Sequence, residues 1–371
     1  MSFKKLRFIP VVFLSLFAAA VVVALATLPA TGSALSQRLA SLAGTPSDFA
    51  HLPVVQYVPQ PTPPPTPTDS PYSAAAVLHI TPFTDILAST FNTASFVIGN
   101  ESLNGERLVE LRIDLRTALF PDMVFDPYGA AGDTVAKDVV VDVREGLGFD
   151  GHTFETPHDG GFDQLVLRFR NFDRDDRFAF SVDIDPTSIT GVGAPGPYHT
   201  GSVGGLELVG ATITATFDDG TVLINQAWRM PDGGSAGGDH SGALAVLRPG
   251  LPERPVLEVA GRVPPAVVDA PEQILRVGGP VGRPVVLLVV EGGLFTNGVS
   301  GGGVDLDPFE ANTALTTREY TGIIGPAGVA DIPVMLSKSL TEGGLNYITA
   351  VFDNHYGVKG QVASPLVLQL P

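Results

Sequence analysis

Cysteine is missing from all 371 residues, which excludes disulfide bonds and lipid attachment through an N-terminal cysteine. The folded part must therefore be held together by core packing or by bound ions. Tryptophan occurs once and tyrosine seven times, against 21 phenylalanines that we expect mostly in the core. Helical periodicity is nearly absent, whereas 42 glycines and 32 prolines are typical of many short strands joined by turns.

Basic residues are also few, with 22 Lys and Arg against 39 Asp and Glu. The first 34 residues hold three of the basic residues and no acidic one, so the remaining 337 residues carry a net charge of −20. This charge argues against nucleic acid and anionic membrane surfaces as partners, because both attract basic patches. It suits a soluble extracellular protein with cation sites.

The N-terminus predicts export. Lys4, Lys5 and Arg7 precede an apolar run over residues 8–26, and small residues before Ala34 suit a signal peptidase that cleaves after it. The apolar run is also long enough for an uncleaved membrane anchor with its basic end inside, and both alternatives stay open. Either one places the rest of the chain outside the cytoplasm, and a membrane would be contacted only through this helix.

A proline-rich tether follows. Seven of the thirteen residues from Pro59 to Pro71 are proline, and such a segment holds an extended polyproline II form about 40 Å long. We therefore divide the chain into a signal peptide or anchor (1–34), a disordered Pro/Thr-rich linker (35–73), a β-sandwich domain (74–250) and an Ig-like β-sandwich domain (251–371). A Gly/Pro-rich stretch over residues 230–255 sets the boundary near Gly250.

From Ala74 onward the apolar pattern has a period of two, which predicts strands with one buried and one wet face. The clearest runs are VELRIDLR (109–116, starting at Val109), RFAFSVDID (177–185) and VGATITATF (209–217). Asp218-Asp219-Gly220 predicts a hairpin turn after the last of these. The fold class we expect is all-β, with two tandem antiparallel β-sandwiches of Ig-like or jelly-roll-like type.

Two stretches carry a resemblance to known modules. Residues 92–240, with FVIGNESLNG, MVFDPYGAAGD, FSVDIDPTSI and GSVGGLELVGATITATFDDG, resemble a β-sandwich module of large secreted bacterial proteins. Those proteins often also carry malectin-type carbohydrate-binding domains. The last 85 residues, with LLVVEGGLFTNG, GGVDLDPFEANT and GLNYITAVFDNHYGVKG, look like the bacterial Ig-like modules that accompany them. The resemblance implies an extracellular or cell-surface, glycan-related setting in a bacterium, and it carries no catalytic residues.

Two motifs that match enzymes lack the structure they require. Gly146-x-Gly148-x-x-Gly151 is followed by no helix that could meet a pyrophosphate, which argues against a nucleotide or other organic cofactor. Gly298-Val299-Ser300-Gly301-Gly302 spells a hydrolase elbow, but no helix follows it either. We expect no enzyme activity.

Calcium is the ion that the acidic clusters favour. Asp183 and Asp185 stand two apart on one predicted strand, so their carboxylates share a face about 6.6 Å apart and can lean toward one ion. The full set of predicted ligands is Asp173, Asp175, Asp183 and Asp185 in the first domain and Asp305, Asp307 and Glu310 in the second. The alternative is a polar strand face kept soluble by acids. A zinc site at His152 and His158 is conceivable, although a solvated loop is the default there.

Glycan binding would need aromatic side chains that stack on sugar rings. Trp228 is the first candidate, followed by Tyr198 and His199 in the loop APGPYHTG and by Tyr128. Packing at the sandwich edge is the default for each of them, because Trp and Tyr are generally well buried. The sequence thus favours a non-enzymatic binding or adhesion module for a polysaccharide or cell-surface glycan, stiffened by calcium. A purely structural Ig-like spacer is the main alternative, and a metal-dependent hydrolase is a distant one.

Overall fold

The computed structural model describes residues 74–82, 89–120, 122–132, 134–187, 203–230, 242–259, 266–292, 317–337, 345–354 and 358–370. The predicted signal or anchor helix and the linker lie outside these residues. The described chain consists of strands and one 3-10 turn, η2 (Leu115–Thr117), and the all-β prediction is therefore confirmed. Among the described residues no helix has the length and apolar character to cross a bilayer.

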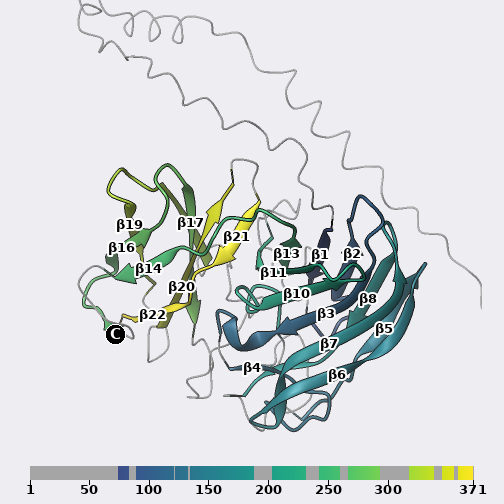
Figure 1. Ribbon diagram of the computed structural model, residues 1–371. Helices are drawn as coiled ribbons and strands as arrows, with labels where there is room; N and C mark the ends of the chain where they lie inside the picture. The colour runs from purple at the N-terminus through teal and green to yellow at the C-terminus, as the bar shows by residue number, and fades with distance from the viewer. Residues whose placement is uncertain are drawn as a thin grey trace, which may run out of the picture. The chain divides into compact units, whose positions relative to one another are not determined.

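The described strands form four sheets (Figure 1). The first has the order β12 (Trp228–Arg229), β13 (Ala243–Leu247), β1 (Ala76–Ile80), β2 (Phe96–Asn100), β8 (Arg177–Ser181) and β5 (Val140–Glu145). The second has the order β11 (Val222–Gln226), β10 (Thr212–Phe217), β3 (Leu108–Asp114), β7 (Gly161–Phe172), β4 (Met123–Phe125) and β9 (Ile184–Pro186), with β6 (Gly148–His158) also paired to β7.

The other two sheets lie beyond residue 250. The third has the order β14 (Val256–Val259), β16 (Glu272–Gly278) and β19 (Val329–Met335). The fourth has the order β15 (Ala266–Val267), β22 (Leu366–Gln369), β20 (Leu345–Asp353), β17 (Pro284–Gly292) and β18 (Thr317–Ile323), with β21 (Lys359–Val362) paired to β20. The described pairings are antiparallel except for β15 with β22, and each joins strands on the same side of residue 250.

The inward residues of the first two sheets form one hydrophobic core, rich in phenylalanine. Phe178 lies at its centre, with its ring 4.9 Å from that of Phe149, 5.1 Å from Phe169 and 6.0 Å from Phe180. Alternation predicts this core well on β10, where Ile213, Ala215 and Phe217 are buried and the intervening threonines are half-buried. The turn predicted after β10 is confirmed, since Gly220 N donates to Phe217 O.

Strand β17 packs on both of its faces, which explains why its sequence VVLLVV is apolar at consecutive positions. Val285, Leu287 and Val289 lie in the core between the third and fourth sheets. Val286, Leu288 and Val290 belong instead to the core of the first two sheets. The two halves of the described chain thus share apolar contacts and belong to one compact unit. The division into two domains at Gly250 stays a prediction.

Tyr347 on β20 lies at this junction, with its ring 4.5 Å from that of Phe120. Burial, helped by the charge of Asp122, raises the pKa of Tyr347 to about 12 from 10.0. The folded state therefore holds this proton more tightly than the unfolded state. The contribution of this proton to the free energy of unfolding is fully present below pH 10, and it is lost as the pH rises through 12.

We expect Tyr347→Phe to remove this alkaline dependence. Phenylalanine keeps the ring packing but has no proton to lose. The free energy of unfolding should therefore fall by about 2 kcal/mol less in the variant than in wild type when the pH rises from 10 to 12. Urea unfolding at pH 8, 10 and 12 would measure the difference. Parallel curves for the two proteins over this range would contradict the assignment.

Two predicted strand patterns need correction. Alternation predicts one strand with a wet face over residues 177–185, but the chain leaves the first sheet after β8 and continues as β9 in the other sheet. Both faces of this run are covered, since Ser181 and Asp185 are 0 % exposed. On β3 the register shifts between Leu108 and Glu110, so Leu108 is buried in place of Val109. Alternation cannot reveal a sheet change or a bulge, because both depend on distant strands.

Candidate functional site

A hollow of about 420 Å³ is lined by residues of β11, β12, β13, β18 and β21 and by Val358, which precedes β21. Its polar lining comes from Asn225, Gln226, Arg229, Glu319 and Lys359. Its apolar lining comes from Trp228, Leu244, Val246 and Val358. Both halves of the described chain contribute, so no local sequence pattern could join these residues into one site, and Trp228 is the one member that the sequence singled out. The volume lies within the range of about 300–1,000 Å³ that is usual for small-molecule sites.

Trp228, the first predicted sugar contact, forms part of the wall of this hollow. It is 3 % exposed, and its ring belongs to the core of the first two sheets. Its backbone pairs with Leu244 on β13. Trp228 is therefore not an open stacking surface, but it is the sole tryptophan of the chain and borders the hollow directly.

Two adjacent amide side chains on β11 connect the walls. Gln226 accepts a hydrogen bond from Val362 N through Oε1 at 3.0 Å. Asn225 donates through Nδ2 to Val246 O at 2.8 Å and, more weakly, to Lys359 O at 3.4 Å. These two carbonyl neighbours identify Nδ2 as the amide nitrogen, since only a donor suits them. Asn225 Oδ1 is buried and has no hydrogen-bond partner among the described residues.

The charged groups of the hollow are paired with carboxylates of the protein. Arg229 Nη1 lies 3.6 Å from Glu319 Oε1, and Lys359 Nζ lies 2.7 Å from Asp353 Oδ2. Each cation thus has a carboxylate within ion-pairing distance. The hollow consequently offers hydrogen-bond donors and acceptors without a net charge.

Tyr128 lies elsewhere, on a loop that follows β4. Its side chain is the most exposed aromatic one described, at 69 %, and its ring contacts the edge of Phe162 at 6.0 Å. The fully buried carboxyl group of Asp126 holds this loop: Oδ1 accepts from Tyr128 N and Ala130 N, and Oδ2 accepts from Ala131 N. Tyr128 is thus presented to solvent on an ordered loop. Tyr198 and His199, the other predicted contacts, lie outside the described residues.

The predicted calcium ligands of the first half do not come together as one group. Asp173 and Asp175 lie at the turn between β7 and β8, where Arg107 Nε donates to Asp173 Oδ1 at 2.8 Å. Asp183 and Asp185 follow the other end of β8, whose five residues span about 17 Å. A single ion cannot bind both pairs.

Asp183 and Asp185 are both buried, at 5 % and 0 % exposure. Asp185 packs against Gly132, where even a methyl group would come within 2.4 Å of its Cβ. Among the described residues no group of three or more potential metal ligands is close enough to hold an ion. Asp305, Asp307 and Glu310 lie outside the described residues, and calcium stays a prediction.

His152 and His158 lie on one continuous strand rather than in a solvated loop, which corrects that expectation. Six residues of strand separate them by about 20 Å, too far for one zinc ion to bind both. His152 Nε2 lies 2.8 Å from Asp138 Oδ1, and His158 Nδ1 lies 2.8 Å from Asp163 Oδ1. Asp159-Gly160 provides the turn that allows the hairpin, with φ values of 41° and 98°.

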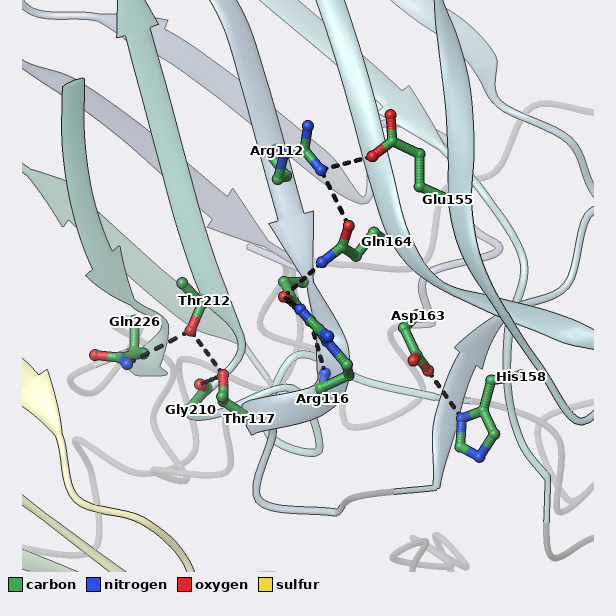
Figure 2. Close-up of polar contacts among 11 residues, drawn as sticks. Arg112, Arg116, Thr117, Glu155, His158, Asp163, Gln164, Gly210, Thr212 and Gln226 are labelled. Carbon is green, nitrogen blue, oxygen red and sulfur yellow. Dashed lines mark hydrogen bonds and ion pairs between the residues drawn. The ribbon is translucent and has the colours of Figure 1, made fainter. Parts of the chain in front are cut away.

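A network of polar side chains crosses the second sheet, and none of its members was among the predicted site residues (Figure 2). Arg112 Nη1 donates to Glu155 Oε2 at 2.7 Å and to Gln164 Oε1 at 3.0 Å, and Gln164 Nε2 donates to Asp114 Oδ2 at 2.8 Å. Burial raises the pKa of Asp114, but the hydrogen bonds from Arg116 and Gln164 outweigh it and hold that pKa below its usual value. The signal in the sequence that could have pointed to this network is the alternation of charged residues in ELRID on β3.

Comparisons with known proteins give no family. No family model matches the chain, and no curated protein matches it. Among solved structures, red sea bream transglutaminase is similar at 12 % identity and a TM-score of 0.17, over 81 % of this chain and 32 % of that one. A variant of BcpA, the major pilin subunit of Bacillus cereus, is similar at 10 % identity and a TM-score of 0.16, over 74 % of this chain and 60 % of that one. The chain thus spans less than two thirds of either protein, and similarity this low carries no argument about function.

Proposed function

We propose that this protein is an exported, non-enzymatic binding module of a bacterial cell surface, and that its ligand is a glycan. In this proposal the four sheets form two tandem β-sandwiches of Ig-like or jelly-roll-like type, carried by the proline-rich linker. The hollow beside Trp228 is the binding site. The observation that carries the proposal is the combination, in one hollow, of an aromatic wall with five polar side chains.

This combination suits a sugar better than a purely apolar ligand. Sugar rings present hydroxyl groups at their edges and apolar C–H groups on their faces, so they need polar and apolar contacts together. Asn225, Gln226 and Arg229 offer the first kind, and Trp228 and Leu244 offer the second. A few polar groups placed among apolar ones are what fixes the orientation of a small ligand.

A non-enzymatic role agrees with the placement of the titratable groups. The two histidines of β6 face separate aspartates, and neither of them lines the hollow. Glu319, the one carboxylate among the described residues of the lining, faces Arg229. Catalysis would need two or three titratable groups that converge on one reacting atom.

A structural spacer is the second candidate, and the burial of both faces of β17 favours it. Such packing holds the two halves together without any ligand. The two roles are compatible, because a stiff module can also present a binding site. Binding data alone separate a spacer that binds nothing from a spacer that binds a glycan.

The test is a titration of the full-length protein with a panel of polysaccharides and oligosaccharides, in calcium and again with a chelator. Because Trp228 is the sole tryptophan, its fluorescence reports directly on the hollow. We expect a saturable fluorescence change with at least one glycan, and calorimetry should give the same affinity. Loss of this binding on chelation would assign calcium a supporting role.

A variant that fills the hollow tests its role, and the same substitution outside the hollow is the matched control. Val358→Phe adds bulk to the lining and should weaken glycan binding by at least about tenfold, because the ligand loses its space. Val281→Phe makes the same change at an exposed position outside the lining and should bind as wild type does. If no glycan binds in either buffer while the protein is folded, the glycan proposal fails and the spacer stands.

A further inference from the structure

Resting on the proposed glycan function, we infer that the hollow takes an uncharged sugar and discriminates against acidic sugars such as uronic acids. The inference depends on the pairing of the charges in the hollow and on the state of one buried amide. It adds to the proposal a ligand class that the sequence does not specify.

The cations of the hollow already have anionic partners within the protein. Arg229 faces Glu319 at 3.6 Å, and Lys359 faces Asp353 at 2.7 Å. A sugar carboxylate would have to compete with these aspartate and glutamate groups for the same cations. It would also bring an additional negative charge into a partly enclosed space where both cations are already neutralised, and burial of such a charge is costly.

Asn225 points to the same conclusion from the side of hydrogen bonding. This residue is 2 % exposed, its Nδ2 donates to two carbonyl oxygens, and its Oδ1 has no partner among the described residues. Oδ1 is an acceptor and needs a donor. A sugar hydroxyl can donate, whereas an ionised carboxylate only accepts. A hydroxyl group placed at this oxygen therefore satisfies it, and a carboxylate placed there does not.

The test uses sugar pairs that differ only at C6. Galactose and galacturonate oligosaccharides of equal length and linkage differ at C6, where a hydroxymethyl group replaces a carboxylate; glucose and glucuronate, and mannose and mannuronate, form further pairs. Methyl esters of the uronates restore neutrality without the hydroxyl. The readouts are Trp228 fluorescence and calorimetry on the full-length protein, at low and at high salt.

We expect the neutral member of the best-binding pair to bind on the order of tenfold more tightly than its uronate. The methyl ester should recover part of this difference. Binding of the neutral sugar should not change with salt, because no net charge is neutralised. A uronate that binds as tightly as its neutral partner overturns this inference and leaves glycan binding in place. If no member of any pair binds, and no glycan of the wider panel binds, both this inference and the proposal of glycan binding are overturned.

Asn225→Ala tests the buried oxygen itself, with Ile224→Ala as the control on the same strand. Ile224 is 51 % exposed and does not line the hollow, so its variant should bind normally. Asn225→Ala should lower the affinity for the neutral sugar about three- to tenfold. The ratio of the affinities for the neutral sugar and for its uronate should decrease accordingly. If this ratio stays unchanged in a variant with wild-type thermal stability, Asn225 does not discriminate between neutral and acidic sugars.

Discussion

Phe178→Ala is expected to lower the free energy of unfolding by about 4 kcal/mol. Phe178 is fully buried on β8, and three other phenylalanine rings lie within 6.0 Å of its own. Truncation removes the transfer free energy of the ring and leaves a cavity between the two sheets that surrounding rings cannot fill without moving. Urea unfolding followed by circular dichroism would measure this change.

Tyr128→Ala is the control for this substitution, because it removes an aromatic ring that is 69 % exposed. Its effect should stay within about 0.5 kcal/mol, as is usual for surface positions. Similar losses for the two variants would mean that the core of the first two sheets does not lie around Phe178.

Asp126→Ala should cost about 3 kcal/mol and loosen the loop that carries Tyr128. The carboxyl group of Asp126 is fully buried and accepts three backbone N–H groups, from Tyr128, Ala130 and Ala131. Alanine cannot replace these bonds, and the three donors would have to find water or remain unsatisfied. Urea unfolding would give the free energy, and limited proteolysis would show whether cleavage moves to residues 126–131.

Asp159→Ala is the comparison, since the Asp159 side chain is 74 % exposed and its Oδ2 lies 3.7 Å from His158 Nε2, and alanine at its φ of 41° adds only a small strain. We expect a change below about 1 kcal/mol for this variant. If Asp126→Ala unfolded at the same urea concentration as wild type and resisted protease equally, the carboxyl group would not be what orders the loop.

Much of the strand pattern could be read from local sequence. Alternation on β10 placed Ile213 and Phe217 in the core, and the Asp-Asp-Gly turn after it follows from the conformational freedom of glycine. The hairpin at Asp159-Gly160 carried a similar signal. The sequence nevertheless favours a loop there, because Gly151 and Pro157 disfavour a strand when they are judged one by one.

The candidate site depends on tertiary structure. Gln226 reaches Val362 across 136 positions of the chain, and Arg229 reaches Glu319 across 90, so no local pattern could join them. The same holds for Trp228: the sequence leaves open both stacking on a sugar and packing at the sandwich edge, and the tertiary structure packs its ring into the core of the first two sheets.

By itself the sequence determined an all-β chain with short strands, because side chains alternate across a strand whatever packs against it. It also determined the absence of disulfides and an acidic net charge. Only the tertiary structure decided that both faces of β17 are buried, that Asp183 and Asp185 lie inside rather than on a wet face, and that Asn225 and Trp228 border one hollow. The physical reason is that burial depends on what covers a face, and here the covering strands come from the other sheet or the other half of the chain.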